Sequence, residues 1–173
     1  MTTPHLAELL SYMQQHGGTE ANRQTSFVSA YFENTDPDET AARGPATLYA
    51  IANAHWRLLD TPHAAQNATL RVFNPTLAED GFVSEHSVVQ IVHEDMPFLV
   101  DSVTMAINRG NRTAHWIVHP LMGVERDEAG KIISASHVAK GAASGQDAGS
   151  NRSFWSSATA LSVWRSSTSS HRN

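Results

Sequence analysis

An acidic turn between an apolar run and an expected helix holds the residues best suited to contact a ligand. Residues 88–92 are apolar except for Gln90 and are followed by His93-Glu94-Asp95. Met96-Pro97 then opens a segment with apolar residues at the helical period. Proline suits the first helical turn, and the helix dipole favours a carboxylate there. Free backbone N–H groups at such a helix start can also bind an anionic ligand group. In the simpler interpretation, a carboxylate of this turn merely caps the helix.

The chain has ten histidines and no cysteine, which leaves imidazoles and carboxylates as the only strong metal ligands. His115 and His119 are four residues apart, as on a zinc-binding helix, but their segment has the composition of a strand. In a strand they share a face at roughly 13 Å from each other, too far to chelate one ion. His86 and His93 could approach other histidines only through tertiary contacts. We therefore expect no metal site.

The sequence lacks the motifs of dinucleotide and hydrolase chemistry. Among its ten glycines there is no GxGxxG loop for a dinucleotide and no GxSxG nucleophile turn. We therefore expect neither catalytic nor cofactor-binding residues in this chain.

The elements that must position the acidic turn form a βαβ unit over residues 88–124. The apolar run predicts a strand, the segment after Pro97 predicts a helix that ends at Gly110, and 113–121 predicts a second strand rich in Ile, Val and Trp. A strand at 69–73 precedes this unit, and residues 122–133 predict a hairpin with a charged turn. The helical period upstream predicts short helices, the longest at 45–59.

These elements predict an α+β chain with three segments. Residues 1–60 form an N-terminal helical layer, and 68–135 form a mostly antiparallel sheet with helices on one side. Residues 136–173 form a Gly-, Ala- and Ser-rich loop and a disordered tail, so the sheet is expected to be incomplete at its C-terminal end. The tail from about Phe154 is odd, because from residue 150 onward there are nine Ser, three Arg and no acidic residue. A shifted reading frame is an alternative: one choice of GC-rich codons, read out of frame, encodes a strand and an acidic helix.

Composition excludes several classes of function. The net charge of −5, with scattered basic residues, argues against a nucleic-acid partner. No apolar run approaches the roughly 18 residues that a membrane helix needs, and the N-terminus lacks the features of a signal peptide. The absence of cysteine fits a cytoplasmic protein.

Several stretches resemble the N-terminal region of the large bacterial NAD-dependent glutamate dehydrogenases. The most specific stretch is 95–102 (DMPFLVDS), and the second is 117–120 (IVHP). Upstream, 72–75 (VFNP) and 79–82 (EDGF) fit the same family, so that the resemblance covers residues 27–133.

The resemblance implies a fold and a role. In that family the region holds the first of several ACT-like (ferredoxin-like) regulatory modules, and the catalytic domain lies far downstream. The chain alone would then be no enzyme. NAD would bind only to the parent enzyme, which converts L-glutamate and NAD to 2-oxoglutarate and ammonium. Its partners would be the remainder of the dehydrogenase or a second copy of the chain, reached through sheet edges.

The resemblance also implies a candidate amino-acid effector site, because ACT modules commonly bind a small amino acid at the loop after the first strand. Its residues here would be Glu94, Asp95, Met96, Pro97 and Asp101. Asp95 or Asp101 could pair with the ligand ammonium. The glycine typical of ligand-binding ACT loops is absent, however, and many such modules bind nothing. A free-standing ACT-type amino-acid sensor that dimerises through its sheet is the alternative, and a histidine-based metal-binding protein is a third.

Overall fold

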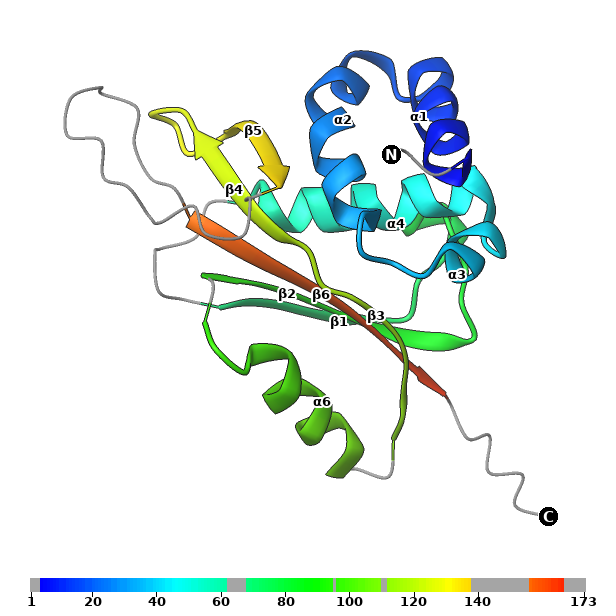
Figure 1. Cartoon of the computed structure of the whole chain (residues 1–173), viewed down its shortest axis with the longest axis vertical. Coiled ribbons are helices and arrows are strands. Elements are labelled where there is room, and N and C mark those ends of the chain that lie inside the picture. The colour runs from blue at the N-terminus through cyan, green and yellow to red at the C-terminus, as the bar shows by residue number, and fades with distance from the viewer. Residues whose placement is uncertain (1–3, 62–67, 95, 110–111, 138–155, 167–173) are drawn as a thin grey trace.

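The computed structural model describes residues 4–61, 68–94, 96–109, 112–137 and 156–166, with only the backbone for Glu94 and 156–166. One sheet separates a layer of helices from a single helix on the opposite face (Figure 1). The elements run in the order α1 (Pro4–His16), α2 (Gly18–Phe32), α3 (Pro37–Ala41), α4 (Gly44–Leu59), β1 (Thr69–Phe73), α5 (Leu77–Asp80), β2 (His86–Glu94), α6 (Leu99–Arg109), β3 (Ala114–Val118), β4 (Leu121–Arg126), β5 (Ile132–His137) and β6 (Ser156–Ser166).

The sheet has six strands in the order β1-β2-β6-β4-β5, and β3 also pairs with β6. Each described pair is antiparallel. Because β2 and β3 are both antiparallel to β6, they run parallel to each other with β6 between them. The β2–α6–β3 crossover is therefore the split βαβ arrangement of ferredoxin-like folds. The predicted α+β class and βαβ unit are confirmed.

Strand β6 differs from the sequence prediction of a disordered tail. Residues 156–166 pair with β2 over its whole length, with His86 opposite Ser166 and Glu94 opposite Ala158. On its other side, β6 pairs with β3 and with β4. The physical reason is that the gap between β2 and the β3–β4 segment exposes two rows of backbone N–H and C=O groups, and a strand there satisfies both rows. The prediction of disorder for 156–166 is wrong, and 138–155 and 167–173 lie outside the described residues.

The main core lies between the helical layer and the sheet. Helices α1, α2 and α4 cover one face of the sheet (Figure 1), and their apolar side chains at helical spacing point toward it. The fully buried side chains of this core include Leu9, Met13, Phe27, Tyr31, Ile51, Leu59 and Met122. On β2, Val88 and Val92 face this core with none of their surface exposed. Successive side chains of β2 therefore point to opposite faces of the sheet, one set into this core and the other toward α6.

The opposite face of the sheet is covered only by α6. Val100, Val103 and Ile107 of this helix pack on Ile91, but α6 has no buried residue. At the edge of the sheet, Leu70 and Val72 of β1 are 60% and 62% exposed. They lie opposite Ile91 and Val89 in register, so they belong to the α6 face. This face therefore leaves apolar surface in contact with solvent.

Several element boundaries differ from the predictions. Strand β1 has the predicted bounds, and β3 ends at Val118, just before His119-Pro120. The apolar residues of 26–32 predict a short helix there, but α2 already starts at Gly18. Helix α6 starts at Leu99 instead of at Met96-Pro97.

Within the described residues, no helix is long and apolar enough to cross a membrane.

Candidate ligand-binding sites

The predicted effector site lies at the turn between β2 and α6. Asp95 and the side chain of Glu94 lie outside the described residues. Met96 is 45% exposed and Asp101 lies on the exposed side of the first turn of α6. Phe98 has a φ of 62° and is 76% exposed, so a bulky residue adopts a left-handed conformation with its ring in solvent. Because of this turn, α6 starts at Leu99, two residues after Pro97. The sequence pattern does not indicate the turn.

Two of the histidines considered as metal ligands do meet. The rings of His86 on β2 and His115 on β3 are stacked with their centroids 4.8 Å apart and their planes 7° apart. Within the residues the structure describes, no group of three or more His, Cys, Asp or Glu is arranged to hold a metal ion.

His55 is a titratable group in the main core. It is fully buried in α4, and its Nδ1 lies 3.1 Å from the Tyr31 hydroxyl on α2. Burial lowers the pKa of His55 from 6.5 to about 3, and a hydrogen bond with the backbone of Ile91 acts in the opposite direction. The neutral imidazole thus connects α2, α4 and β2. The sequence gives its place on the apolar face of the helix but not its hydrogen-bond partners.

A polar groove runs between α2 and α4, and its cavity volume is about 640 Å³. It is lined by Gly17, Glu20, Gln24, Tyr49, Asn53, Trp56, Arg57, Asp60 and Thr61. From Tyr49 to Asp60 the lining residues recur at spacings of three and four residues, the period of a helix. Because the apolar periodicity describes only the buried face, the sequence analysis missed this groove.

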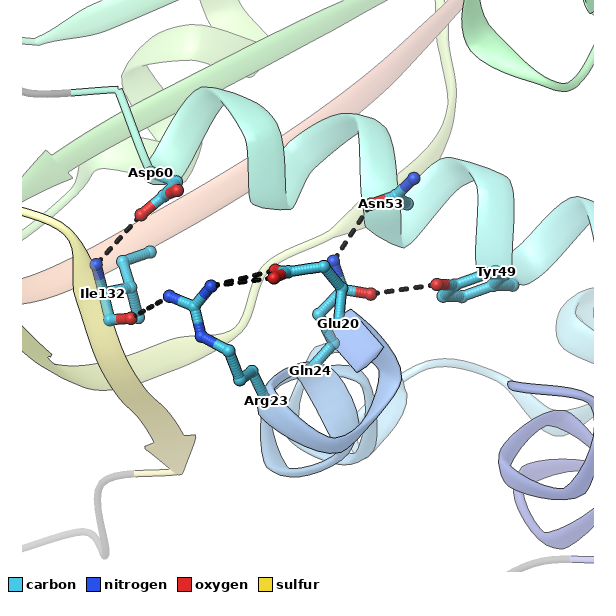
Figure 2. A network of polar contacts seen from close by, with 7 residues as sticks. All are labelled: Glu20, Arg23, Gln24, Tyr49, Asn53, Asp60 and Ile132. Carbon is cyan, nitrogen blue, oxygen red and sulfur yellow. Dashed lines mark hydrogen bonds and ion pairs between the residues drawn. The ribbon is translucent and has the colours of Figure 1, made fainter. Parts of the chain in front are cut away.

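Hydrogen bonds fix the side chains in the floor of the groove (Figure 2). Gln24 is only 2% exposed; its Nε2 donates to Oδ1 of Asn53 at 3.0 Å, and its Oε1 accepts from the Tyr49 hydroxyl at 3.1 Å. Burial, and then the charge of Glu20 and the nearby Tyr12, raise the pKa of Tyr49. The hydroxyl therefore keeps its proton and remains a donor.

The left end of the groove in Figure 2 is tied to the sheet through β5. Oδ1 of Asp60 accepts from the backbone N–H of Ile132 at 2.9 Å, and Arg23 donates to the carbonyl of the same residue. Arg23 also pairs with both carboxylate oxygens of Glu20 at 3.0 Å. From β4, Arg126 donates to the carbonyl of Leu59 at 2.6 Å. The β4–β5 hairpin thus holds the C-terminal end of α4.

A second cavity of about 540 Å³ lies among α1, the end of α2, α3 and α4. Leu6, Leu9, Phe32 and Leu48 form its apolar part, and Glu33, Asn34 and Asp36 are among its polar residues. Asp36 already serves as the N-cap of α3, because its side chain accepts from the N–H of Asp38 at 2.9 Å. Among the residues of its lining that the structure describes, none is a Lys or Arg that could pair with an anionic ligand.

The split βαβ sheet with a helical layer defines an α+β module of the ACT-like class. The family model described as "Glutamate dehydrogenase, ACT1 domain" matches residues 27–166, and the chain belongs to this family.

The chain is similar to "NAD-specific glutamate dehydrogenase" of Pseudomonas aeruginosa, with 33% identity over 126 residues, 72% of this chain and 8% of that protein. It is also similar to "NAD-specific glutamate dehydrogenase" of Halomonas elongata, with 32% identity over 109 residues, 62% of this chain and 7% of that protein. The chain thus spans less than a tenth of the length of these relatives. No solved structure matches it significantly. The resemblance stated from the sequence is confirmed.

Proposed function

We propose that this chain is the N-terminal regulatory and assembly part of an NAD-dependent glutamate dehydrogenase. The parent reaction would be the oxidation of L-glutamate by NAD to 2-oxoglutarate and ammonium in the cytoplasm. Family membership over 27–166 and the names of the two relatives support this proposal. The chain itself would contribute contacts and no catalytic residue, and NAD would bind only elsewhere in the parent enzyme.

The observation that carries the assembly role is the exposed edge of the sheet at β1. Among the described residues, β1 pairs only with β2, so its other edge offers unpaired N–H and C=O groups. Leu70 and Val72 lie on this edge strand, on the α6 face of the sheet, and each is about three-fifths exposed. Such an edge suits strand addition, in which backbone hydrogen bonds provide affinity and apolar side chains add buried area. We propose the remainder of the dehydrogenase as its partner.

A binding experiment tests the assembly role. The chain would be produced together with a separate polypeptide that holds the rest of a family dehydrogenase, and complex formation and dehydrogenase activity would be measured. Replacing both Leu70 and Val72 by Lys should weaken the complex at least tenfold, because it places two charges at the contact. Val83→Lys is the matched control, since Val83 is 69% exposed but lies outside the strand. Unchanged binding by the double variant would refute the assembly role of β1.

The alternative function is a free-standing ACT-type sensor that dimerises through the same edge. The observation that favours it is the exposed turn before α6, where Phe98 is left-handed and 76% exposed beside the candidate effector residues Met96, Pro97 and Asp101. In that case the isolated chain should be a dimer that dissociates when Leu70 and Val72 become Lys. Light scattering after gel filtration would distinguish the alternatives, because the assembly proposal alone predicts a monomer.

A further inference from the structure

The groove between α2 and α4 carries charged groups of both signs at one place. Glu20 and Asp60 contribute carboxylates, and Arg57 contributes a guanidinium. Asp60 caps the C-terminal end of α4, three residues after Arg57, and this spacing at a helix places the two Cβ atoms about 5–6 Å apart. Within the described residues, however, they form no ion pair with each other, and Asp60 is turned toward β5 instead. The groove therefore holds neighbouring charges of opposite sign that are not paired with each other.

The hydrogen bonds of the groove leave particular atoms for a ligand. Oδ1 of Asn53 is occupied by Gln24, which leaves the two N–H donors of its Nδ2. Oδ1 of Asp60 is occupied by Ile132, and the charge of Asp60 also acts on Arg126 of β4, which leaves Oδ2 as an acceptor. Glu20 is neutralised by its two contacts with Arg23. The groups that remain are a guanidinium and an amide N–H pair for an anion, and one carboxylate oxygen for a cation.

The floor of the groove is built to keep these groups in place. Gln24 is nearly fully buried and hydrogen-bonded at both ends of its amide, which orients Asn53. Gly17 contributes by having no side chain, because a Cβ there would lie 2.8 Å from the Tyr49 hydroxyl. Trp56 is 3% exposed and forms an aromatic part of the wall. A groove with fixed polar groups loses less entropy on binding than a flexible surface.

We propose that this groove binds a small zwitterion of the free amino-acid class, with its carboxylate on Arg57 and Asn53 and its ammonium on Asp60. A cavity of about 640 Å³ is large enough for such a ligand. This inference rests on the proposed regulatory function, for which the groove would be the ligand site. The site lies in the helical layer, on the opposite side of the sheet from α6 and its N-terminal turn (Figure 1).

The test is a titration of the purified full-length chain by calorimetry, with tryptophan fluorescence as a second signal from Trp56. L-glutamate and glycine are the zwitterionic probes; acetate and methylammonium each carry only one of the two charges. The zwitterions should show saturable binding, and each half-ligand should bind at least tenfold more weakly. Binding of acetate as tight as that of glycine would overturn the role of Asp60.

Variants locate the site. Arg57→Gln removes the guanidinium from an exposed position, and Asp60→Asn removes the charge while keeping an oxygen that can accept from Ile132. Each should weaken zwitterion binding at least tenfold. Arg57→Gln should leave the melting temperature almost unchanged, whereas Asp60→Asn also removes the charge that acts on Arg126, so its melting temperature is measured beside its affinity. The matched control is Arg109→Gln, which removes an exposed arginine from α6. Unchanged affinity in the Arg57 variant, or no saturable binding up to about 10 mM, would overturn the inference.

A further variant separates this inference from the proposed effector turn and from the proposed function. If Asp101→Asn abolishes binding and Arg57→Gln does not, the ligand binds at the turn before α6 and the groove inference fails. If no amino acid binds but the chain still forms a complex with the rest of the dehydrogenase, the groove inference fails and the assembly role stands. If the groove binds but no complex forms, the assembly role fails alone.

Discussion

The buried imidazole of His55 makes the stability of the chain depend on pH. Its pKa is lowered from 6.5 to about 3 in the folded chain, mainly by burial. A lowered pKa means that the unfolded chain binds the proton more tightly. The stabilisation is therefore fully present above pH 6.5 and is lost as the pH falls toward 3. Because one pKa unit corresponds to about 1.4 kcal/mol, the full loss approaches about 5 kcal/mol.

The magnitude in an accessible range of pH follows from the same values. At pH 7 the unfolded His55 is mostly neutral, and at pH 5 it is mostly protonated, whereas the folded His55 is neutral at both. The free energy of unfolding should therefore fall by about 2 kcal/mol between pH 7 and pH 5 on account of this residue alone. A difference between variants isolates the contribution of His55.

The assay is urea unfolding followed by tryptophan fluorescence at pH 7 and pH 5, because Trp56 and Trp116 are buried. His55→Gln removes the titration, so its free energy of unfolding should depend less on pH than that of the natural chain, by about 2 kcal/mol. His16→Gln, which removes an exposed imidazole from α1, is the control for the loss of one histidine. If both variants show the same pH dependence as the natural chain, within about 0.5 kcal/mol, the argument is refuted.

Further predictions concern stability and the reading frame. Gly17→Ala should lower the free energy of unfolding by about 1–3 kcal/mol, because a Cβ would lie 2.7 Å from that of Ala21; a loss below about 0.5 kcal/mol in urea unfolding would contradict this. Asp80→Asn should cost about 2 kcal/mol in urea unfolding, because Asp80 is 5% exposed and pairs with Arg71 at 2.8 Å; a loss no larger than that of the exposed neighbour in Glu79→Gln would argue against it. Deletion of 156–173 should abolish cooperative thermal unfolding, since β6 pairs with β2, β3 and β4; a retained sharp transition would show that the sheet does not need β6. The shifted-frame hypothesis for the tail stays a prediction, which the nucleotide sequence from the Ser150 codon onward would decide.

The elements that the sequence predicted well are those with a strong local signal. Alternation in 69–73 gave both bounds of β1, and the apolar spacing of α4 gave its end and its buried face. Helix α2 shows where prediction from apolar spacing fails. Its first turns (GTEANRQT) are mostly polar and have no apolar residues at the helical period. Those turns are stabilised by contacts across the helical layer, such as those from Gln24 to α4, which a local pattern cannot contain.

The candidate sites were predictable to different degrees. The acidic turn was located from sequence, but the left-handed Phe98 was not, because nothing in its side chain favours a positive φ. The polar groove depends on which faces of two helices meet, and residues 17–24 and 49–61 come together only through tertiary packing. For β6, a serine-rich composition suggested disorder. The position of β6 depends on backbone pairing with β2 and β4 on its two sides, rather than on the strand propensity of its own residues.

The position of β6 has a consequence for how the chain folds. The last described strand lies at the centre of the sheet, so β2 and the β3–β4 segment cannot be joined until it arrives. Before that, only the local β1–β2 and β4–β5 pairs and the helices can form. Pairing of β2 with β6 closes a long loop, which is entropically costly and slows folding. During synthesis, the N-terminal helices, the β1–β2 pair and the β4–β5 pair should therefore form separately. The complete sheet should form only in a late step, when β6 pairs with its neighbours.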